Sequence, residues 1–260
     1  MIDLHCHVLP GLDDGPENMD EALELLARQA ECGVDAVVAT PHVSHNYPGV
    51  TAEAIAEGVK ELREAAKDAR IPVRVIAGAE VALTRAVDLS DRQLAALRLG
   101  GGPWLLLEPP YAPMSASALE AAIGGLLRRG HRIVLAHPER CSAFHTDREP
   151  LERLIEAGVR CSVTAGALTG AFGRTVRKFA LEMLEDGLVH NIASDAHGGM
   201  ESRPPGLAGP LKEAGYEDLA EWLCHQVPLA LLGGTEPPDP PAVHRHKRGL
   251  GRGLTRLLGN

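Results

Sequence analysis

Two pairs of side chains, one near each end of the chain, have the spacing of metal ligands. His5 and His7 lie two residues apart, and so do Asp195 and His197. Successive side chains of a β-strand point to opposite faces, so residues two apart share a face and can hold one ion. Imidazole and carboxylate groups without thiolate suit Mn, Zn or Fe. Each pair alone is weak evidence, because His-x-His also occurs by chance.

Four further ionisable residues each close a short apolar run. They are His42, Glu80, Glu108 and His137. Apolar runs of this length predict buried strands. In a βα barrel the C-terminal ends of the strands meet at one rim, where catalytic groups lie. We therefore expect these four residues and the two pairs to form one active site.

A purely structural role for this set is a poor alternative. It would require several acids and imidazoles buried together and satisfied only by one another, which is costly without cations. His131 and His190 fall at the starts of predicted strands, on the opposite rim, and we assign them no chemistry. His45 is a candidate lining residue of the mouth.

The first loop, Asp13-Asp14-Gly15-Pro16, adds two acids directly after the first predicted strand. One of them is a candidate further ligand. An acidic turn leading into the helix that starts near Asn18 is an equally open alternative on spacing alone.

The elements that must position these groups alternate along the chain. Short runs rich in Val, Ile, Leu and Ala alternate with segments of helical period, which indicates βα units and a parallel sheet closed into a barrel. The predicted strands are Met1–His7, Val34–His42, Val73–Glu80, Trp104–Glu108, His131–His137, Arg160–Ala165 and Val189–His197. Seven strands fit better than eight. The predicted helices are Asp20–Glu31, Ala52–Ala69, Ser117–Arg129, Arg148–Ala157, Arg174–Glu185 and Ala208–Ala214, with a short helix at Asp91–Leu94.

Length and composition restrict the class of protein. A chain of 260 residues with 45% hydrophobic and 23% charged residues is typical of one soluble α/β domain, and no apolar run is long enough to span a membrane. The N-terminus lacks the basic and apolar segments of a secretory signal, so we expect a cytoplasmic protein with reduced thiols. Its five cysteines include no Cys-x-x-Cys pair, which argues against a disulfide framework or a structural zinc site.

Charge is distributed unevenly. The formal net charge is −9, but the residues from Pro240 onward contain five Lys or Arg and no acid. Without those five, 21 basic residues face 35 acidic ones, a charge of −14. Such a body repels nucleic-acid phosphates, so we do not expect nucleic acid as a partner. We expect a barrel domain over residues 1–234, and a Pro/Gly-rich linker with a basic, flexible tail over residues 235–260; docking of the tail to an acidic partner or a membrane surface is the alternative.

Six motifs in order carry a family resemblance. They are Met1–His7, Asp13–Pro16, Ala39–His42, Gly78–Glu80, Ala136–Arg140 and Ser194–His197. Together they resemble the PHP (polymerase and histidinol phosphatase) superfamily. The acidic loop, the His-x-Glu-Arg sequence at 137–140 and Ser202–Pro205 resemble the bacterial capsule-associated protein-tyrosine phosphatases. The resemblance extends from Met1 to about Gly234, and both Pro109-Pro110 and the basic tail depart from it.

This resemblance implies a distorted seven-stranded barrel of the PHP type that holds three divalent metal ions, manganese first, with Zn or Fe as alternatives. It implies a first ion held by His5, His7, Glu80 and Asp195, a second held by Glu80, Glu108 and His137, and a third held by Asp14, His42 and His197. Arg140 and Arg203 would bind the substrate phosphate. A hydroxide bridging the metal ions would attack phosphorus, so that no protein nucleophile is needed.

Several functions stay open at this point. The first is a protein-tyrosine phosphatase acting on a tyrosine-rich tail, such as that of a bacterial tyrosine kinase that controls polysaccharide export. The second is a small-molecule phosphatase of the histidinol phosphate type, and the third is a non-catalytic, metal-stabilised binding module, which the complete ligand set disfavours. An exonuclease is disfavoured by the acidic body and the 3% aromatic content. Thiol-based phosphatase chemistry is disfavoured too, because no cysteine has an arginine six residues later.

Overall fold

The computed structural model describes residues 1–110, 114–198 and 203–241, and every strand pair in these ranges is parallel. Nine strands form two sheets, ordered β1-β2-β4 and β3-β5-β6-β7-β8-β9. The strands are β1 (Ile2–Cys6), β2 (Ala36–Ala39), β3 (His42–Val43), β4 (Arg74–Ala77), β5 (Glu80–Ala82), β6 (Trp104–Glu108), β7 (Arg132–Ala136), β8 (Arg160–Thr164) and β9 (Asn191–Ala193). The predicted parallel α/β fold is confirmed, whereas the predicted count of seven strands differs from the nine described.

Two interrupted strands account for the difference in count. The predicted strand Val34–His42 is divided into β2 and β3, and Val73–Glu80 into β4 and β5. In both cases the first half pairs in one sheet and the second half in the other. Pro41, at the first break, has no N–H for a ladder hydrogen bond. At the second break the backbone passes so close to β2 that a Cβ on Gly78 would lie 2.7 Å from Val38 Cγ1.

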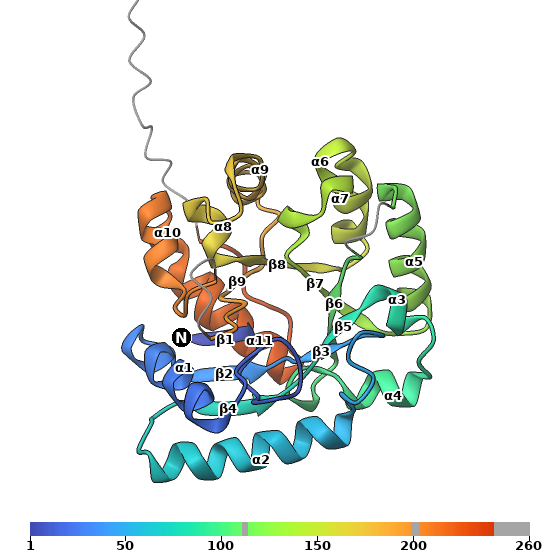
Figure 1. Cartoon of the computed structure of the whole chain (residues 1–260). Coiled ribbons are helices and arrows are strands. Elements are labelled where there is room, and N and C mark those ends of the chain that lie inside the picture. The colour runs from blue at the N-terminus through green and yellow to red at the C-terminus, as the bar shows by residue number, and fades with distance from the viewer. Residues whose placement is uncertain (111–113, 199–202, 242–260) are drawn as a thin grey trace, which may run out of the picture.

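Helices surround the strands (Figure 1). They are α1 (Met19–Glu31), α2 (Ala52–Asp68), α3 (Leu83–Ala86), α4 (Asp91–Ala96), α5 (Ala116–Arg128), α6 (Ser142–Thr146), α7 (Glu149–Glu156), α8 (Ala165–Thr169), α9 (Arg174–Glu185), α10 (Ala208–Ala214) and α11 (Val227–Gly233). Side chains of Asn18, Thr51 and Ser115 accept backbone N–H groups at the starts of α1, α2 and α5, and Ser90 forms a capping box with Gln93 at α4. The six long predicted helices and the short one at Asp91–Leu94 are confirmed within two residues at each end.

Burial on both faces of a strand explains why its sequence is a continuous apolar run. Leu105, Leu106 and Leu107 of β6 are all fully buried, because one face of the strand meets the interior and the other meets the helices. The ends of β1 and β9 are joined by backbone hydrogen bonds: His7 N–H donates to Ala196 O at 2.9 Å and Asp195 N–H donates to His5 O at 2.8 Å. These bonds bring the first and last ligand pairs of the sequence side by side.

The end of the described chain lies against the starts of β7 and β8. Trp222 Nε1 donates to Pro238 O at 2.8 Å, and Glu236 lies 3.5 Å from Arg132 Nη1 and 3.7 Å from Arg160 Nη2. The predicted basic tail lies outside the described residues. In the described part no helix is long and apolar enough to cross a membrane, and the cytoplasmic location stays a prediction.

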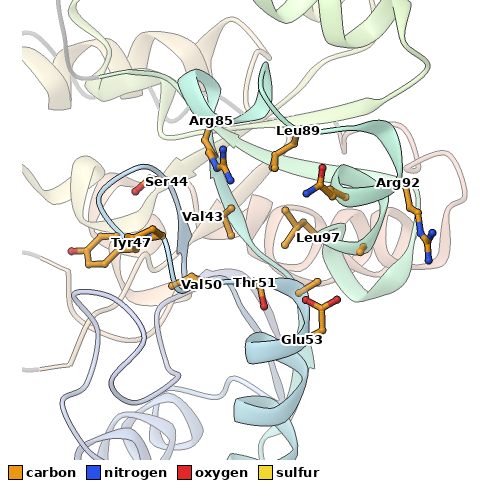
Figure 2. Close-up of a pocket in the computed structure, with 14 residues that line it drawn as sticks. Val43, Ser44, Tyr47, Val50, Thr51, Glu53, Arg85, Leu89, Arg92 and Leu97 are labelled. Atoms are coloured by element: carbon orange, nitrogen blue, oxygen red, sulfur yellow. The ribbon is translucent and has the colours of Figure 1, made fainter.

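A cavity of about 460 Å³ opens beside β3 (Figure 2). Its walls come from the connection between β3 and α2, the start of α2, and the segment that contains α3 and α4.

Candidate metal centre

The strand ends place all nine predicted ligands at one rim. His5 and His7 lie on β1 and just after it, His42 opens β3, Glu80 opens β5, Glu108 ends β6, His137 follows β7, Asp195 and His197 follow β9, and Asp14 lies in the loop after β1. His137 and Asp195 have left-handed backbones, with φ of 32° and 53°. Side-chain-bearing residues rarely adopt this conformation, and it is concentrated at functional sites.

Four of these side chains converge at the junction of β1, β5 and β9. Nε2 of His5 lies 3.1 Å from Nε2 of His7, and each of these nitrogens lies 3.2 Å from Glu80 Oε2. Asp195 Oδ1 lies 3.3 Å from His5 Nε2 and 3.5 Å from His7 Nε2. All four side chains are buried. The structure thus brings together the four residues assigned to the first ion.

Glu80 connects this first group to a second one. Its Oε1 lies 2.8 Å from His137 Nε2, while its Oε2 lies 3.0 Å from His42 Nδ1. The same His42 nitrogen lies 3.7 Å from Glu108 Oε2, so that His42, Glu80 and Glu108 form a compact group of donors. A carboxylate placed between imidazoles on both sides is suited to bridge two ions.

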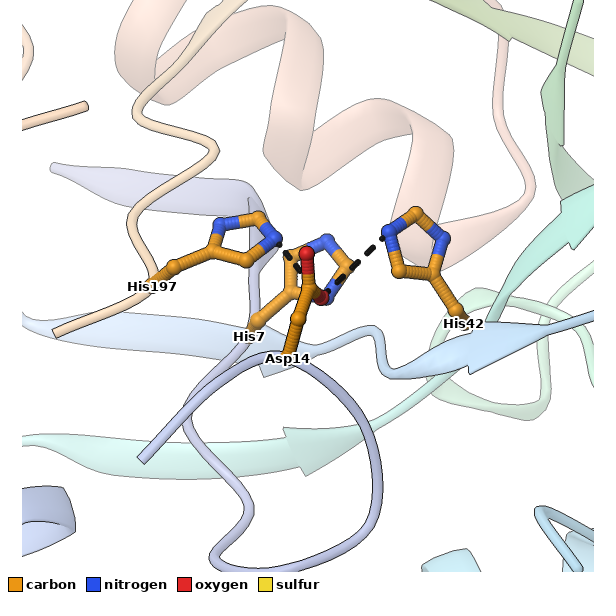
Figure 3. Close-up of side chains that lie close together, drawn as sticks. All are labelled: His7, Asp14, His42 and His197. Carbon is orange, nitrogen blue, oxygen red and sulfur yellow. Dashed lines mark ion pairs between the residues drawn. The ribbon is translucent and has the colours of Figure 1, made fainter. Parts of the chain in front are cut away.

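A third group gathers around the carboxylate of Asp14 (Figure 3). Asp14 Oδ1 lies 3.2 Å from His197 Nε2 and 3.5 Å from His42 Nε2. The ring of His7 stacks on that of His197 with their centroids 3.7 Å apart. His7 and His42 therefore each contribute to two of the three donor groups.

The donor set fits divalent ions. Two donors that share one ion through bonds of about 2.1 Å lie roughly 3 Å apart. The donor atoms of the first group have this spacing. Within the described residues Glu80 Oε2 is buried without a hydrogen-bond partner, although three imidazole nitrogens lie within 3.2 Å of it. A buried carboxylate oxygen without a hydrogen-bond partner, with several imidazole nitrogens converging on it, fits a cation site.

The two acids of the first loop have different positions. Asp13 Oδ2 lies 2.6 Å from His7 Nδ1 and accepts the backbone N–H of His42 at 2.8 Å. It thus faces the outer nitrogen of His7, whereas Asp14 faces the donor cluster. A carboxylate on the outer nitrogen of a ligating imidazole fixes the tautomer that presents the other nitrogen to the metal. The spacing of the sequence could not distinguish these two roles.

Gly15 allows this loop to approach β1. A Cβ at position 15 would lie 2.7 Å from the carbonyl oxygen of His7, closer than real Cβ contacts. Gly15 N–H also donates to Asp13 Oδ1 at 3.1 Å. The glycine therefore lets the loop deliver both acids to the rim.

The electrostatics keeps the central acids ionised. Burial disfavours the charged forms of Glu80 and Asp195, but their neighbours together outweigh it and hold both pKa values well below the usual range. His5 and His137 act on both carboxylates, with His42 acting on Glu80 and Arg140 on Asp195. Burial also disfavours protonated His7, yet the carboxylates of Asp13 and Glu80 beside its ring raise the pKa of His7 to about 10. The carboxylates are thus available as anionic ligands at neutral pH.

Two arginines lie at the edge of the cluster. Arg140 Nη1 lies 3.0 Å from Asp195 Oδ2, and its guanidinium packs over Phe172 with 5.0 Å to the ring centroid. Arg203 Nη1 lies 2.9 Å from His197 Nε2 and 3.5 Å from Asp195 Oδ1. Both guanidinium groups therefore contact the donor cluster at the carboxylate of Asp195.

Three further histidines of the described chain lie away from the donor groups. His131 and His190 lie at the starts of β7 and β9, on the opposite rim, as predicted. His45 pairs with Asp88 at 3.1 Å and is largely exposed, outside the donor groups. Pro109 and Pro110, which depart from the expected pattern, line a small cavity of about 50 Å³ together with His137 and Arg140.

Comparison with known proteins decides the family. Residues 1–216 match the family described as capsular polysaccharide synthesis, CpsB/CapC. The chain belongs to the CpsB/CapC family. It is 33% identical to the tyrosine-protein phosphatase YwqE of Bacillus subtilis over 199 residues, which cover 76% of this chain and 77% of YwqE. It is 29% identical to the tyrosine-protein phosphatase CpsB of Streptococcus pneumoniae over 212 residues, which cover 79% of this chain and 86% of CpsB.

A solved structure supports the same family. It comes from the pair YwqE of Bacillus subtilis and CpsB of Streptococcus pneumoniae, described as unique metal-dependent tyrosine phosphatases. The TM-score is 0.78 at 30% sequence identity, and the match covers 92% of this chain and 99% of that one. The predicted resemblance to capsule-associated tyrosine phosphatases is therefore confirmed.

Proposed function

We propose that this CpsB/CapC family member is a metal-dependent protein-tyrosine phosphatase. The observation that carries the proposal is the convergence of three overlapping donor groups at one rim, with Arg140 and Arg203 at their edge. The relatives named as tyrosine-protein phosphatases support the choice of substrate. The substrate we propose is a phosphotyrosine segment of a protein, such as a bacterial tyrosine kinase involved in capsular or extracellular polysaccharide production.

The cluster would hold three ions, with Mn first and Zn or Fe as alternatives. The first would take His5, His7, Glu80 and Asp195, the second Glu80, Glu108 and His137, and the third Asp14, His42 and His197. The nitrogen and oxygen donors suit these metals better than a soft, thiolate-binding one. The position of His42 between two donor groups makes it a candidate ligand of the second ion also.

The chain's own residues would handle the substrate. When bound, divalent ions supply an activated water and positive charge for phosphoryl oxygens. Arg140 and Arg203 would bind the phosphate through their planar, multidentate guanidinium groups. A phenolate leaves readily because the pKa of tyrosine is about 10, so the demand on a protein acid is modest.

We propose in addition that the two sheets form one distorted barrel of the PHP type. Seven strands result if β2 and β3 count as one interrupted strand and β4 and β5 as another. The hydrogen bonds between the ends of β1 and β9 support closure on the other side. The phosphoesterase domain would comprise residues 1–234, because α11 ends at Gly233 and Gly234 has a left-handed backbone. Residues 235–260 would be linker and tail.

Substrate competition tests the proposed function. The chelator-treated protein, resupplied with Mn, Zn, Fe or Mg separately, is assayed for kcat/KM on a phosphotyrosine peptide and on histidinol phosphate. We expect metal-dependent turnover that favours the peptide. A preference for histidinol phosphate would instead indicate a small-molecule phosphatase. No turnover with any of the metals would indicate a non-catalytic binding module.

A further inference from the structure

The cavity beside β3 adjoins the donor cluster. Val43, in its wall, directly follows His42 in β3, and Tyr47 lines the cavity while its ring is stacked on that of His42. The two ring planes differ by only 5°, with 5.9 Å between their centroids. A ligand whose reacting group lies at the donor cluster can therefore extend past Tyr47 into this cavity.

The inner wall of the cavity is apolar. Val43, Val50, Leu89 and Leu97 line it (Figure 2), and each is at most 6% exposed. The exposed side chain of Val87 lies two residues from Leu89 in the chain and is 55% exposed. A surface of this kind gains stability when an aliphatic or aromatic side chain covers it.

The polar groups of the cavity are of two kinds. Thr51 and Gln93 serve as caps of α2 and α4, and Glu53 accepts hydrogen bonds at the start of α2. Arg85 and Arg92, in contrast, make no ion pair or hydrogen bond within the described ranges. In Figure 2 the guanidinium of Arg85 points toward the apolar wall. The cavity therefore carries two positive charges on a protein whose net charge is −9.

We propose that this cavity binds the segment that flanks the phosphotyrosine of an acidic protein substrate. An aliphatic or aromatic side chain of that segment would cover the apolar wall, and neighbouring carboxylates would pair with Arg85 and Arg92. Charge complementarity decides the class of occupant, because an arginine pair beside an apolar wall favours acidic over basic flanks. The inference rests on the proposed phosphatase function and adds a substrate preference to it.

The test compares substrates and charge-reversal variants. Three phosphotyrosine peptides of equal length carry an acidic flank with one leucine, the same acidic flank without leucine, or a basic flank with leucine. For the variant Arg85→Glu/Arg92→Glu we expect KM for the acidic leucine peptide to rise about tenfold, with kcat nearly unchanged. Turnover of p-nitrophenyl phosphate should stay at the wild-type value, since this substrate does not reach the cavity. The wild type should prefer the acidic leucine peptide over both others.

Two variants control this experiment. Arg74→Glu makes a charge reversal at an exposed residue at the start of β4, away from the cavity, and should leave every peptide unaffected. Arg85→Gln removes charge without reversing it, so it provides an intermediate effect if the double variant fails to fold. Equal KM values for the three peptides, or equal losses in Arg74→Glu and Arg85→Glu/Arg92→Glu, would overturn the proposal. Hydrolysis of free phosphotyrosine by the wild type tests the phosphatase function separately, so the two failures are distinguishable.

Discussion

The contact between Asp13 and His7 shows how a residue outside the ligand set acts on the metal centre. Asp13 is fully buried at its side chain and bonds the nitrogen of His7 that faces away from Glu80. We predict that Asp13→Ala weakens Mn affinity about 10–100-fold, because His7 loses its fixed orientation. Isothermal titration of the chelated protein measures this. Asp20→Asn, in the exposed first turn of α1, is the control, and wild-type affinity in Asp13→Ala would refute the positioning role.

The two roles of Arg140, pairing with Asp195 and the proposed binding of phosphate, can be tested separately. It pairs with Asp195 at the edge of the donor cluster, and the proposed function assigns it to the substrate phosphate. We predict that Arg140→Ala lowers kcat/KM for phosphotyrosine peptide about 10²–10³-fold, as loss of one donor to a transition state does. Arg140→Lys should recover only part of this, since it keeps the charge but loses the planar fork. If Arg140→Ala lowers only thermal stability and keeps kcat/KM, the contact with Asp195 is its whole role.

At the scale of elements, the residue directly before β9 is a histidine that is held neutral. His190 Nδ1 accepts the backbone N–H of Cys161, at 3.2 Å, next to β8. Burial, assisted by the positive charge of Arg160, lowers the pKa of His190 from 6.5 to about 4. Between these pH values the unfolded chain binds a proton that the folded protein does not. The contribution of neutral His190 to the free energy of unfolding is therefore complete above pH 6.5 and is lost as the pH falls to about 4.

We predict that His190→Gln makes the free energy of unfolding less dependent on pH in this window, by up to about 1.4 kcal/mol per pH unit. Glutamine is suitable because its amide oxygen can also accept the Cys161 N–H. Urea unfolding at several pH values measures the slope. The same slope in wild type and variant would show that His190 does not titrate in this way.

The elements also show what periodicity can and cannot predict. Long segments such as α2 and α9 have enough turns for an apolar face to be recognised, and β6 was predicted with its observed bounds. The short helices α3, α6, α8 and α11 were not predicted, because four to seven residues give few repeats of the helical period, and at this length recognition is unreliable although α4 and α10 were predicted. The breaks within the two interrupted strands depend on packing between β2 and Gly78, which no local pattern contains.

For the site, strand ends and two-residue spacing were enough to predict eight of the nine proposed ligands, and only the family resemblance singled out Asp14. The split between Asp13 and Asp14 was not predictable from spacing, because both follow β1 in the same loop and only the approach at Gly15 fixes which carboxylate faces which nitrogen. The dual position of His42 also depends on the tertiary fold, which presents its two nitrogens to different groups.

At the scale of the whole molecule, the boundary of the domain is open to a direct test. Glu236 contacts Arg132 and Pro238 contacts Trp222, so the chain is held beyond Gly234. We predict that removal of residues 242–260 leaves turnover and stability unchanged. Removal from residue 235 onward should lower the free energy of unfolding by about 1 kcal/mol, chiefly through the Trp222 hydrogen bond. Equal stability of the two truncated proteins, measured by urea unfolding, would place the boundary at Gly234.

The central claim is that the His, Asp and Glu cluster binds the ions on which phosphotyrosine hydrolysis depends. The most direct measurement is a titration of the chelated protein with Mn in which bound metal per chain and phosphotyrosine-peptide turnover are followed together. The account predicts no turnover without metal and a rise in turnover as the groups around Glu80 and Asp14 fill. Full turnover by protein that retains no metal would contradict it.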